Sequence, residues 1–366
     1  GYAEEDRPAT PALLHAWIKR EFGIDVSRAP ILEGHAAPFD YIVHTFFEGL
    51  WSGTAPQAGA AVAPGVVEST ATMSGGVPPT DCVLWANRGG GKTFLGALAT
   101  VLDLIFKPGI EVRILGGSLE QSQRMHTHLC RFLEVAPKGA AMVKGRITAR
   151  RIALSNGSTL ELLAQSQTSV RGTRVQKIRC DEVDLFDPRV WEAAQLATRS
   201  KQCGAVAVRA AVECLSTMHI PHGVMYRIVQ EAQRGGRALF RWGVVDVLEQ
   251  CASVRPCGIE DQEDGQPADA TIPAAVPPDA PDDPDACVLA EDCRGRAKEH
   301  NGLRAGHIGI DDGVRMKGRV SMAVWKAEMM SLHPRRTNAV VPEFDPRVHV
   351  VCSREGWAWS EPGPAG

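Results

Sequence analysis

The stretch Asp81-Cys-Val-Leu-Trp-Ala-Asn-Arg-Gly-Gly-Gly-Lys-Thr93 joins a short apolar segment to three glycines and a Lys-Thr pair. Residues 82–86 predict a buried strand, and the apolar run from Phe94 to Phe106 predicts a helix directly after the glycines. Glycine has no Cβ, so backbone N–H groups in such a turn can approach an anion closely. The N-terminus of the following helix adds positive potential. This order predicts a phosphate-binding loop.

The residue types in this loop suit a nucleoside triphosphate. A lysine here can reach the β- and γ-phosphates, and the next hydroxyl can bind Mg²⁺. Ala86 stands where the pattern G-x-x-x-x-G-K-[ST] has its first glycine, and a glycine-rich turn without a ligand is the alternative. The residues expected at the nucleotide are Asn87, Gly89, Gly90, Gly91, Lys92 and Thr93.

A second acidic motif follows a predicted strand at residues 175–180, which Lys177 and Arg179 interrupt. Asp181 would hold Mg²⁺ through water, and Glu182 would orient or deprotonate the attacking water. The alternative is an acidic cluster at a helix start, where the helix dipole favours negative charge.

A further strand, predicted at residues 205–215, ends in Ser216-Thr217-Met218-His219. Polar residues at the carboxyl end of a parallel core strand lie beside a nucleotide, so Ser216 and Thr217 are expected to sense the γ-phosphate. A simple cap between strand and turn is the alternative.

Strands and helices alternate along the middle of the chain. Strands are predicted at 111–115 and 238–245, and helices at 222–234 and from Ser118, as N-cap, to about Leu133. This alternation predicts an α/β fold, a P-loop NTPase (RecA/ASCE-like) with a mostly parallel sheet and helices on both faces.

Composition is that of a globular protein, with 44% hydrophobic and 23% charged residues among 366. No apolar run approaches the ~20 residues of a membrane span, and no signal peptide is recognised. Of ten cysteines, Cys82, Cys180 and Cys214 fall in predicted core strands, which suits reduced thiols. We expect a protein of the cytoplasm, with no membrane partner.

Charge is distributed unevenly. Residues 258–286 hold nine acidic groups and no Lys or Arg, so the rest of the chain has 40 basic residues against 34 acidic ones. Such a balance permits a polyanionic partner. The basic segment 144–151 begins a predicted hairpin that ends at Leu163, and its cations are either contacts to a phosphate backbone or an ordinary solvated edge.

The flanking segments divide the chain further. Residues 1–51 are expected to be helical, with Thr10 as a cap, and residues 52–80 to be a flexible linker. The ATPase core is expected over 81–248, a Cys-flanked insert over 249–320, and a C-terminal linker over 321–366.

Taken in order, these motifs resemble the ATPase portion of a tailed-phage large terminase subunit, over roughly residues 40–350. The similarity lies in an arginine within a phosphate loop that lacks its first glycine, and in a short strand ending before a Ser-capped helix. It also lies in an Arg-Gly element before the acidic pair, a Ser-Thr element after it, and a join towards a nuclease. The matching segments are Ala86–Thr93, Ile114–Ser118, Arg171-Gly172, Asp181-Glu182, Ser216-Thr217, Val324–Glu328 and Val341–Asp345.

This resemblance implies an ATP-driven, Mg²⁺-dependent motor that moves double-stranded DNA into a procapsid inside the bacterial host cell. It implies a homo-oligomeric ring working with a portal and a small terminase subunit. Arg88 is the first candidate for the positive charge at the γ-phosphate, and Arg171, Arg174 or Arg199 would serve a neighbouring subunit. The family's nuclease domain would begin after about Asp345, so we expect no DNA cleavage by this chain.

Two cysteine pairs, Cys251-x5-Cys257 and Cys287-x5-Cys293, flank the acidic segment. Their arrangement suggests a four-thiolate site for Zn²⁺ or an iron–sulfur cluster, with His300 and His307 as substitute ligands. Four unrelated reduced cysteines are the alternative.

Two other functions compete with the packaging motor. One is a helicase-like or other DNA-remodelling P-loop NTPase, although residues 246–366 show no second α/β alternation that could form its second domain. The other is an inactive prophage-derived DNA-binding remnant, against which the intact Lys92, Thr93, Asp181 and Glu182 argue.

Overall fold

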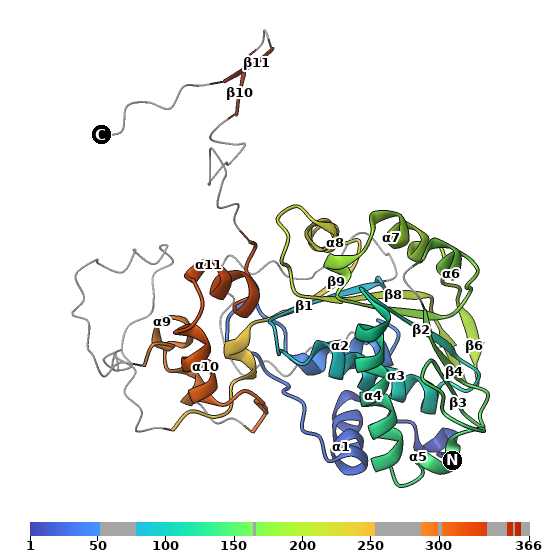
Figure 1. Ribbon diagram of the computed structural model, residues 1–366. Coiled ribbons are helices and arrows are strands. Elements are labelled where there is room, and N and C mark those ends of the chain that lie inside the picture. Colours follow the sequence, from blue (N-terminus) through green and yellow to red (C-terminus); the bar gives the residue numbers. More distant parts are fainter. Residues whose placement is uncertain are drawn as a thin grey trace.

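The computed structural model describes residues 1–51, 78–163, 166–252, 287–298, 302–334, 350–353 and 356–359. Its centre is a seven-stranded sheet with the order β3-β4-β2-β5-β8-β1-β9 (Figure 1). These strands are β1 (Cys82–Ala86), β2 (Glu111–Gly116), β3 (Arg151–Ala153), β4 (Thr159–Leu163), β5 (Lys177–Asp181), β8 (Ala211–Ser216) and β9 (Ala238–Trp242). Two hairpins lie outside it, β6 (Lys201–Cys203) with β7 (Val206–Val208), and β10 (Val350–Ser353) with β11 (Gly356–Trp359).

The sheet is parallel except at one edge, where β3 pairs antiparallel to β4. Strand β8 lies between β1, which precedes the glycine turn, and β5, which ends in the acidic pair. One strand in that position is the arrangement of RecA/ASCE-like P-loop NTPases. The predicted fold class is confirmed.

Helices cover both faces of the sheet (Figure 1). The longer ones are α1 (Pro11–Phe22), α2 (Pro38–Phe46), α3 (Lys92–Phe106), α4 (Leu119–Val135), α7 (Pro188–Gln195) and α8 (Val224–Gln233), and the shorter ones are α5 (Gly139–Met142) and α6 (Gln167–Arg171). Because side chains alternate along a strand, Leu84 packs with α1 to α4, whereas Val83 and Trp85 pack with α7 and α8.

Local signals in the sequence predicted the helix starts well. Thr10 caps α1 by accepting a hydrogen bond from Leu13 N at 3.3 Å, and Ser118 caps α4 through Gln121 N at 3.2 Å. The helical prediction for residues 1–51 was too broad, because Gly23, at φ 68°, ends α1 in the left-handed conformation. Most of the predicted linker, residues 52–77, lies outside the described residues.

Two strand predictions were wrong in extent. The strand expected at 205–215 is split into β7 and β8, because Arg209 N donates to Glu48 and Ala210 N donates to Ser200 instead of continuing a ladder. The strand expected at 238–245 stops at Trp242, where Asp246 accepts a hydrogen bond from Gly243 N at 2.9 Å and starts a 3₁₀ turn.

Lys177 and Arg179, the two cations that interrupt β5, lie in a fully buried group of charges that we call the ion cluster. It has three carboxylates and three cations: Glu48, Asp103, Glu213, Lys107, Lys177 and Arg179. Arg179 lies 2.6 Å from Asp103 and 2.9 Å from Glu213, and Lys177 lies 3.3 Å from Glu48. The cluster therefore joins β5 to α3, to β8 and to the end of α2.

The C-terminal part packs around a small apolar cluster that also includes Ile31 and Val245. It contains α9 (Ala290–Cys293), α10 (Ile310–Lys317), α11 (Met322–Val324) and a π-helical turn at Trp325–Met329. Leu248, Leu289 and Trp325 are central to its packing. Among the described helices, none has the length and apolarity needed to cross a bilayer.

Candidate nucleotide site

Lys92 begins α3 and is buried at the end of the glycine turn, with 6% of its surface exposed. Its Nζ donates to the carbonyl oxygens of Ala86 at 3.2 Å and Asn87 at 2.9 Å, and to Thr217 Oγ1 at 2.7 Å. Burial lowers the pKa of Lys92, against the opposing influence of Glu182 and Asp181. The ammonium is thus fixed between the turn and the end of β8.

The glycines of the turn are required by its shape. A Cβ on Gly90 would lie 2.3 Å from Asn87 Oδ1, and Gly89 and Gly91 have φ values of 74° and 84°. Trp242 Nε1, at the end of β9, donates to Gly90 O at 2.9 Å, and this hydrogen bond stabilises the turn.

The C-terminal part also holds the turn. Arg88 N donates to Glu328 O at 2.8 Å. His307 Nε2 lies 2.8 Å from Gly89 O, so that nitrogen carries the proton. His307 therefore serves the phosphate loop, and the expectation that it substitutes as a ligand in the cysteine site finds no support in its contacts.

Thr93 and Asp181 come together as the sequence predicts for a magnesium site, with Thr93 Oγ1 donating to Asp181 Oδ2 at 3.0 Å. Burial, followed by the charge of Glu182, raises the pKa of Asp181 to about 7. Its Oδ1 is buried and accepts no hydrogen bond from the described residues. A hydroxyl beside an unsatisfied carboxylate oxygen suits a hard cation such as Mg²⁺.

Glu182 has an uncommon backbone conformation, with φ 55° and ψ 50°, fixed by a 2.8 Å hydrogen bond from its N–H to Leu215 O. Burial would raise the pKa of its carboxyl, but His219 and the charge of Lys92 outweigh that and lower the pKa. Its Oε2 is buried and receives no hydrogen bond within the described part. An ionised carboxylate with a spare acceptor can orient water.

Ser216 and Thr217 differ in what they contact. Thr217 Oγ1 accepts from Lys92 and donates to Ala86 O at 3.1 Å, so it touches the phosphate loop directly. Ser216 Oγ donates to Thr217 O at 2.9 Å and accepts from Asp184 N at 3.3 Å. Ser216 therefore orders the strand end, and its hydroxyl is already engaged.

Sequence reasoning missed Asp184, which is buried two residues after the acidic pair. Its carboxylate accepts from His219 N at 2.7 Å, Ile220 N at 2.9 Å and Met225 N at 3.3 Å. One side chain thus orders the loop that follows β8. Glu328 was also missed as a site residue, because the segment Val324–Glu328 was interpreted as part of the join towards a nuclease.

Comparisons with known proteins were made on both sequence and structure. No family model matches the sequence, and no curated protein matches it. The solved structures include the large terminase of the thermophilic bacteriophage D6E, with 13% identity and a TM-score of 0.36 over 45% of this chain. They also include the large terminase ATPase domain of Thermus phage P74-26, with 15% identity and a TM-score of 0.35 over 45% of this chain.

The large terminase of bacteriophage HK97 matches over 69% of this chain, with 12% identity and a TM-score of 0.42. The structure is similar to phage large terminases. The matched region spans 41% of the D6E protein, 76% of the P74-26 domain and 46% of the HK97 protein.

The arginines proposed to contact the γ-phosphate lie in different places. Arg88 is at the tip of the phosphate loop, with its side chain 78% exposed and Nη1 3.5 Å from Glu328 Oε2. Arg171, Arg174 and Arg199 are exposed. Arg199 N donates to Val175 O before β5 begins, so Arg174 and Arg199 lie near the opposite rim from Asp181. Of these four arginines, Arg88 is the one that lies on the phosphate loop.

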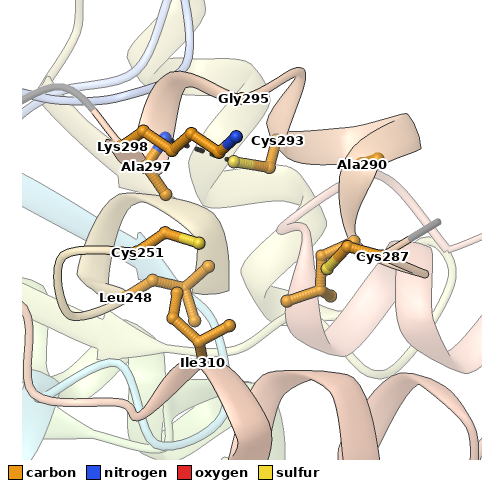
Figure 2. Close-up of a pocket in the computed structure, with 10 residues that line it drawn as sticks. Leu248, Cys251, Cys287, Ala290, Cys293, Gly295, Ala297, Lys298 and Ile310 are labelled. Carbon is orange, nitrogen blue, oxygen red and sulfur yellow. Dashed lines mark hydrogen bonds between the residues drawn. The ribbon is translucent and has the colours of Figure 1, made fainter. Parts of the chain in front are cut away.

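Three of the four predicted thiolate ligands, Cys251, Cys287 and Cys293, line one small pocket, and the sulfurs of Cys251 and Cys293 point into the same space (Figure 2). Cys257 and His300 lie outside the described residues. Among the residues that are described, no three His, Cys, Asp or Glu side chains are placed to hold a metal ion. The four-thiolate site stays a prediction.

Proposed function

We propose that this chain is a Mg²⁺-dependent ATPase and the motor of a double-stranded DNA packaging machine. The observation that carries the proposal is the 3.0 Å contact between Thr93 and Asp181. It joins the phosphate loop to the acidic pair at one edge of a parallel sheet, where nucleotides bind in this fold class.

Each side chain has a distinct role in the proposed reaction. Backbone N–H groups of the glycine turn and Lys92 would bind the β- and γ-phosphates, and Thr93 and Asp181 would hold Mg²⁺. Bound Mg²⁺ neutralises phosphate charge. Glu182 would orient the attacking water and accept its proton, and Arg88 would stabilise the charge that develops on the γ-phosphate.

DNA would be contacted through its phosphates. Lys144, Arg146, Arg150 and Arg151 are exposed around the start of the β3–β4 hairpin. Exposed cations of this kind bind a duplex backbone without sequence preference. The terminase likeness favours translocation in the bacterial cytoplasm by a homo-oligomeric ring, assisted by a portal and a small subunit.

One observation weighs against the inactive remnant. An inactive remnant has no need to keep Lys92, Thr93, Asp181 and Glu182 in contact distance of a shared site.

The test is ATP hydrolysis by the wild-type chain and by Glu182→Gln. We expect Glu182→Gln to lose about 10²- to 10⁴-fold in kcat, the range for removing a general base, with ATP affinity retained. Lys92→Ala should lose nucleotide binding itself. Equal background rates in wild type and Glu182→Gln would favour the inactive remnant, and stimulation by single strands alone would favour a helicase.

A further inference from the structure

His219, which follows β8, lies between two carboxylates. Its Nε2 is 3.8 Å from Glu182 Oε2, and its Nδ1 is 3.6 Å from Glu328 Oε1. The side chain is 29% exposed, so it borders the site without being solvated freely. No sequence motif assigns it a task.

Hydrogen bonds to the carboxylate of Asp184 fix the backbone around His219. Asp184 accepts the N–H groups of His219 and Ile220 at 2.7 and 2.9 Å, and Ser216 accepts the N–H of Asp184. A Cβ on Gly223 would lie 2.8 Å from Asp184 Oδ1, so the loop closes tightly over this carboxylate. The imidazole therefore projects from a fixed point on the rigid edge of the sheet.

Glu182 needs such a neighbour. Its backbone is fixed by Leu215 O, but its Oε2 receives no hydrogen bond from any described residue. The 3.8 Å gap to His219 is longer than a hydrogen bond and short enough for charge pairing.

We propose that His219 is a positioning residue for Glu182, holding its carboxylate toward the attacking water while Glu328 orients the imidazole through Nδ1. The inference rests on the proposed ATPase function. It deepens that function by assigning how the general base is aimed.

Charge on the imidazole follows from its surroundings. The contact with Glu182 raises the pKa of His219; burial opposes this, and the charges of Glu328 and Asp184 reinforce it. Arg88, the nearby cation, is 3.5 Å from Glu328 and competes for that carboxylate. Because the pKa of His219 is raised and that of Glu182 is lowered, the pair is charged between the two values and is lost as the pH rises through the pKa of His219.

The activity test separates positioning from folding. His219→Ala should lower kcat about 10- to 100-fold, since misplacing a catalytic group by about 1 Å costs that much, while the KM for ATP stays within about twofold. We expect the kcat of the wild type to fall at alkaline pH, as His219 loses its charge. His219→Gln, which keeps a hydrogen-bond donor, should recover part of kcat and show no such fall. The control is His222→Asn, because His222 lies in the same loop, packs on Tyr226 and tolerates this change at φ 60°.

A second readout does not depend on turnover. In the full-length chain with ¹⁵N-labelled histidine, the His219 signal, assigned by its loss in His219→Gln, should titrate at a lower pH in Glu182→Gln than in wild type. An unchanged midpoint would overturn the proposal, as would a His219→Ala enzyme with wild-type kcat. A wild-type chain without ATPase activity would refute the proposed function and leave the titration as the test of the contact.

Discussion

Two of the places where the protein buries charge, the ion cluster and the nucleotide site, are built on opposite plans. The ion cluster balances three carboxylates with three cations, and Glu213 there accepts hydrogen bonds from Tyr41 at 2.7 Å and Thr45 at 2.6 Å. The nucleotide site sets Lys92 against two carboxylates, and Asp181 Oδ1 and Glu182 Oε2 there accept no hydrogen bond from the described residues.

The difference appears in the pKa values. Burial alone would raise the pKa of Asp103, but Lys107, Lys177 and Arg179 hold it below its ordinary value. For Asp181, burial and Glu182 raise the pKa to about 7, and Thr93 and Lys92 only partly oppose them. Buried charge that is fully partnered within the chain serves the fold, whereas under-partnered charge is kept for a ligand.

The largest expected contrast comes from removing one cation from each place. Arg179→Met should lower the free energy of unfolding by about 3–5 kcal/mol, because it leaves buried carboxylates unpaired. Lys92→Met should change stability far less and abolish ATP binding. Urea unfolding and nucleotide titration measure the two effects. Equal loss of stability in both variants would break the comparison.

The stability that the ion cluster contributes should depend on pH in the acid range. Burial would raise the pKa of Glu213, but Arg179 and Lys177 outweigh it and lower the pKa. A depressed folded-state pKa means that the stabilisation is present above the unfolded value of about 4.3 and is lost as the pH falls through the folded value. Glu213→Gln should therefore be much less stable than wild type at neutral pH, and the gap in urea midpoint should narrow in acid. A gap independent of pH would contradict this.

A smaller effect is expected from the hydrogen bond between Trp242 and the phosphate loop. Trp242→Phe removes the hydrogen bond from Nε1 to Gly90 O and keeps most of the buried ring. A net hydrogen bond contributes about 1 kcal/mol, so ATP affinity should weaken roughly fivefold. Trp17→Phe is the control and should leave the affinity unchanged, because this buried tryptophan packs on Phe106, at the end of α3 far from the phosphate loop.

The smallest effect on the ATPase core is expected from substitutions in the cysteine pocket. If the four-thiolate prediction holds, the purified chain contains about one Zn²⁺ or one iron–sulfur cluster, which Cys251→Ser and Cys293→Ser lose and Cys130→Ser keeps. Elemental analysis and the visible spectrum measure it. A wild-type chain that contains no metal when purified under reducing, chelator-free conditions would contradict the four-thiolate prediction. That result would not bear on the proposed nucleotide site.

Much of the fold was predictable because it depends on residues adjacent in the chain. The glycine turn, the helix after it and the caps at Thr10 and Ser118 are local signals. The structural role of Lys177 and Arg179 in β5 could not be predicted in this way, because their partners are far away in the sequence. Arg179 pairs with Glu213, 34 positions later, and Lys177 donates to Thr45, 132 positions earlier.

The site was predictable to a similar depth. Lys92, Thr93, Asp181 and Glu182 belong to motifs whose order places them at the carboxyl ends of β1 and β5, the two strands that flank β8. Asp184 looked like one more acidic residue, since its partners are backbone N–H groups of a loop 35 or more positions away. Glu328 reaches the site only through the packing of the C-terminal part against the turn.

The most direct test of the central claim is a crystal structure of Glu182→Gln with ATP and Mg²⁺. We predict the β- and γ-phosphates within hydrogen-bond reach of Lys92 Nζ and the turn's N–H groups, with the metal between Thr93 and Asp181. A nucleotide bound elsewhere, or a metal that contacts neither Thr93 nor Asp181, would contradict the account.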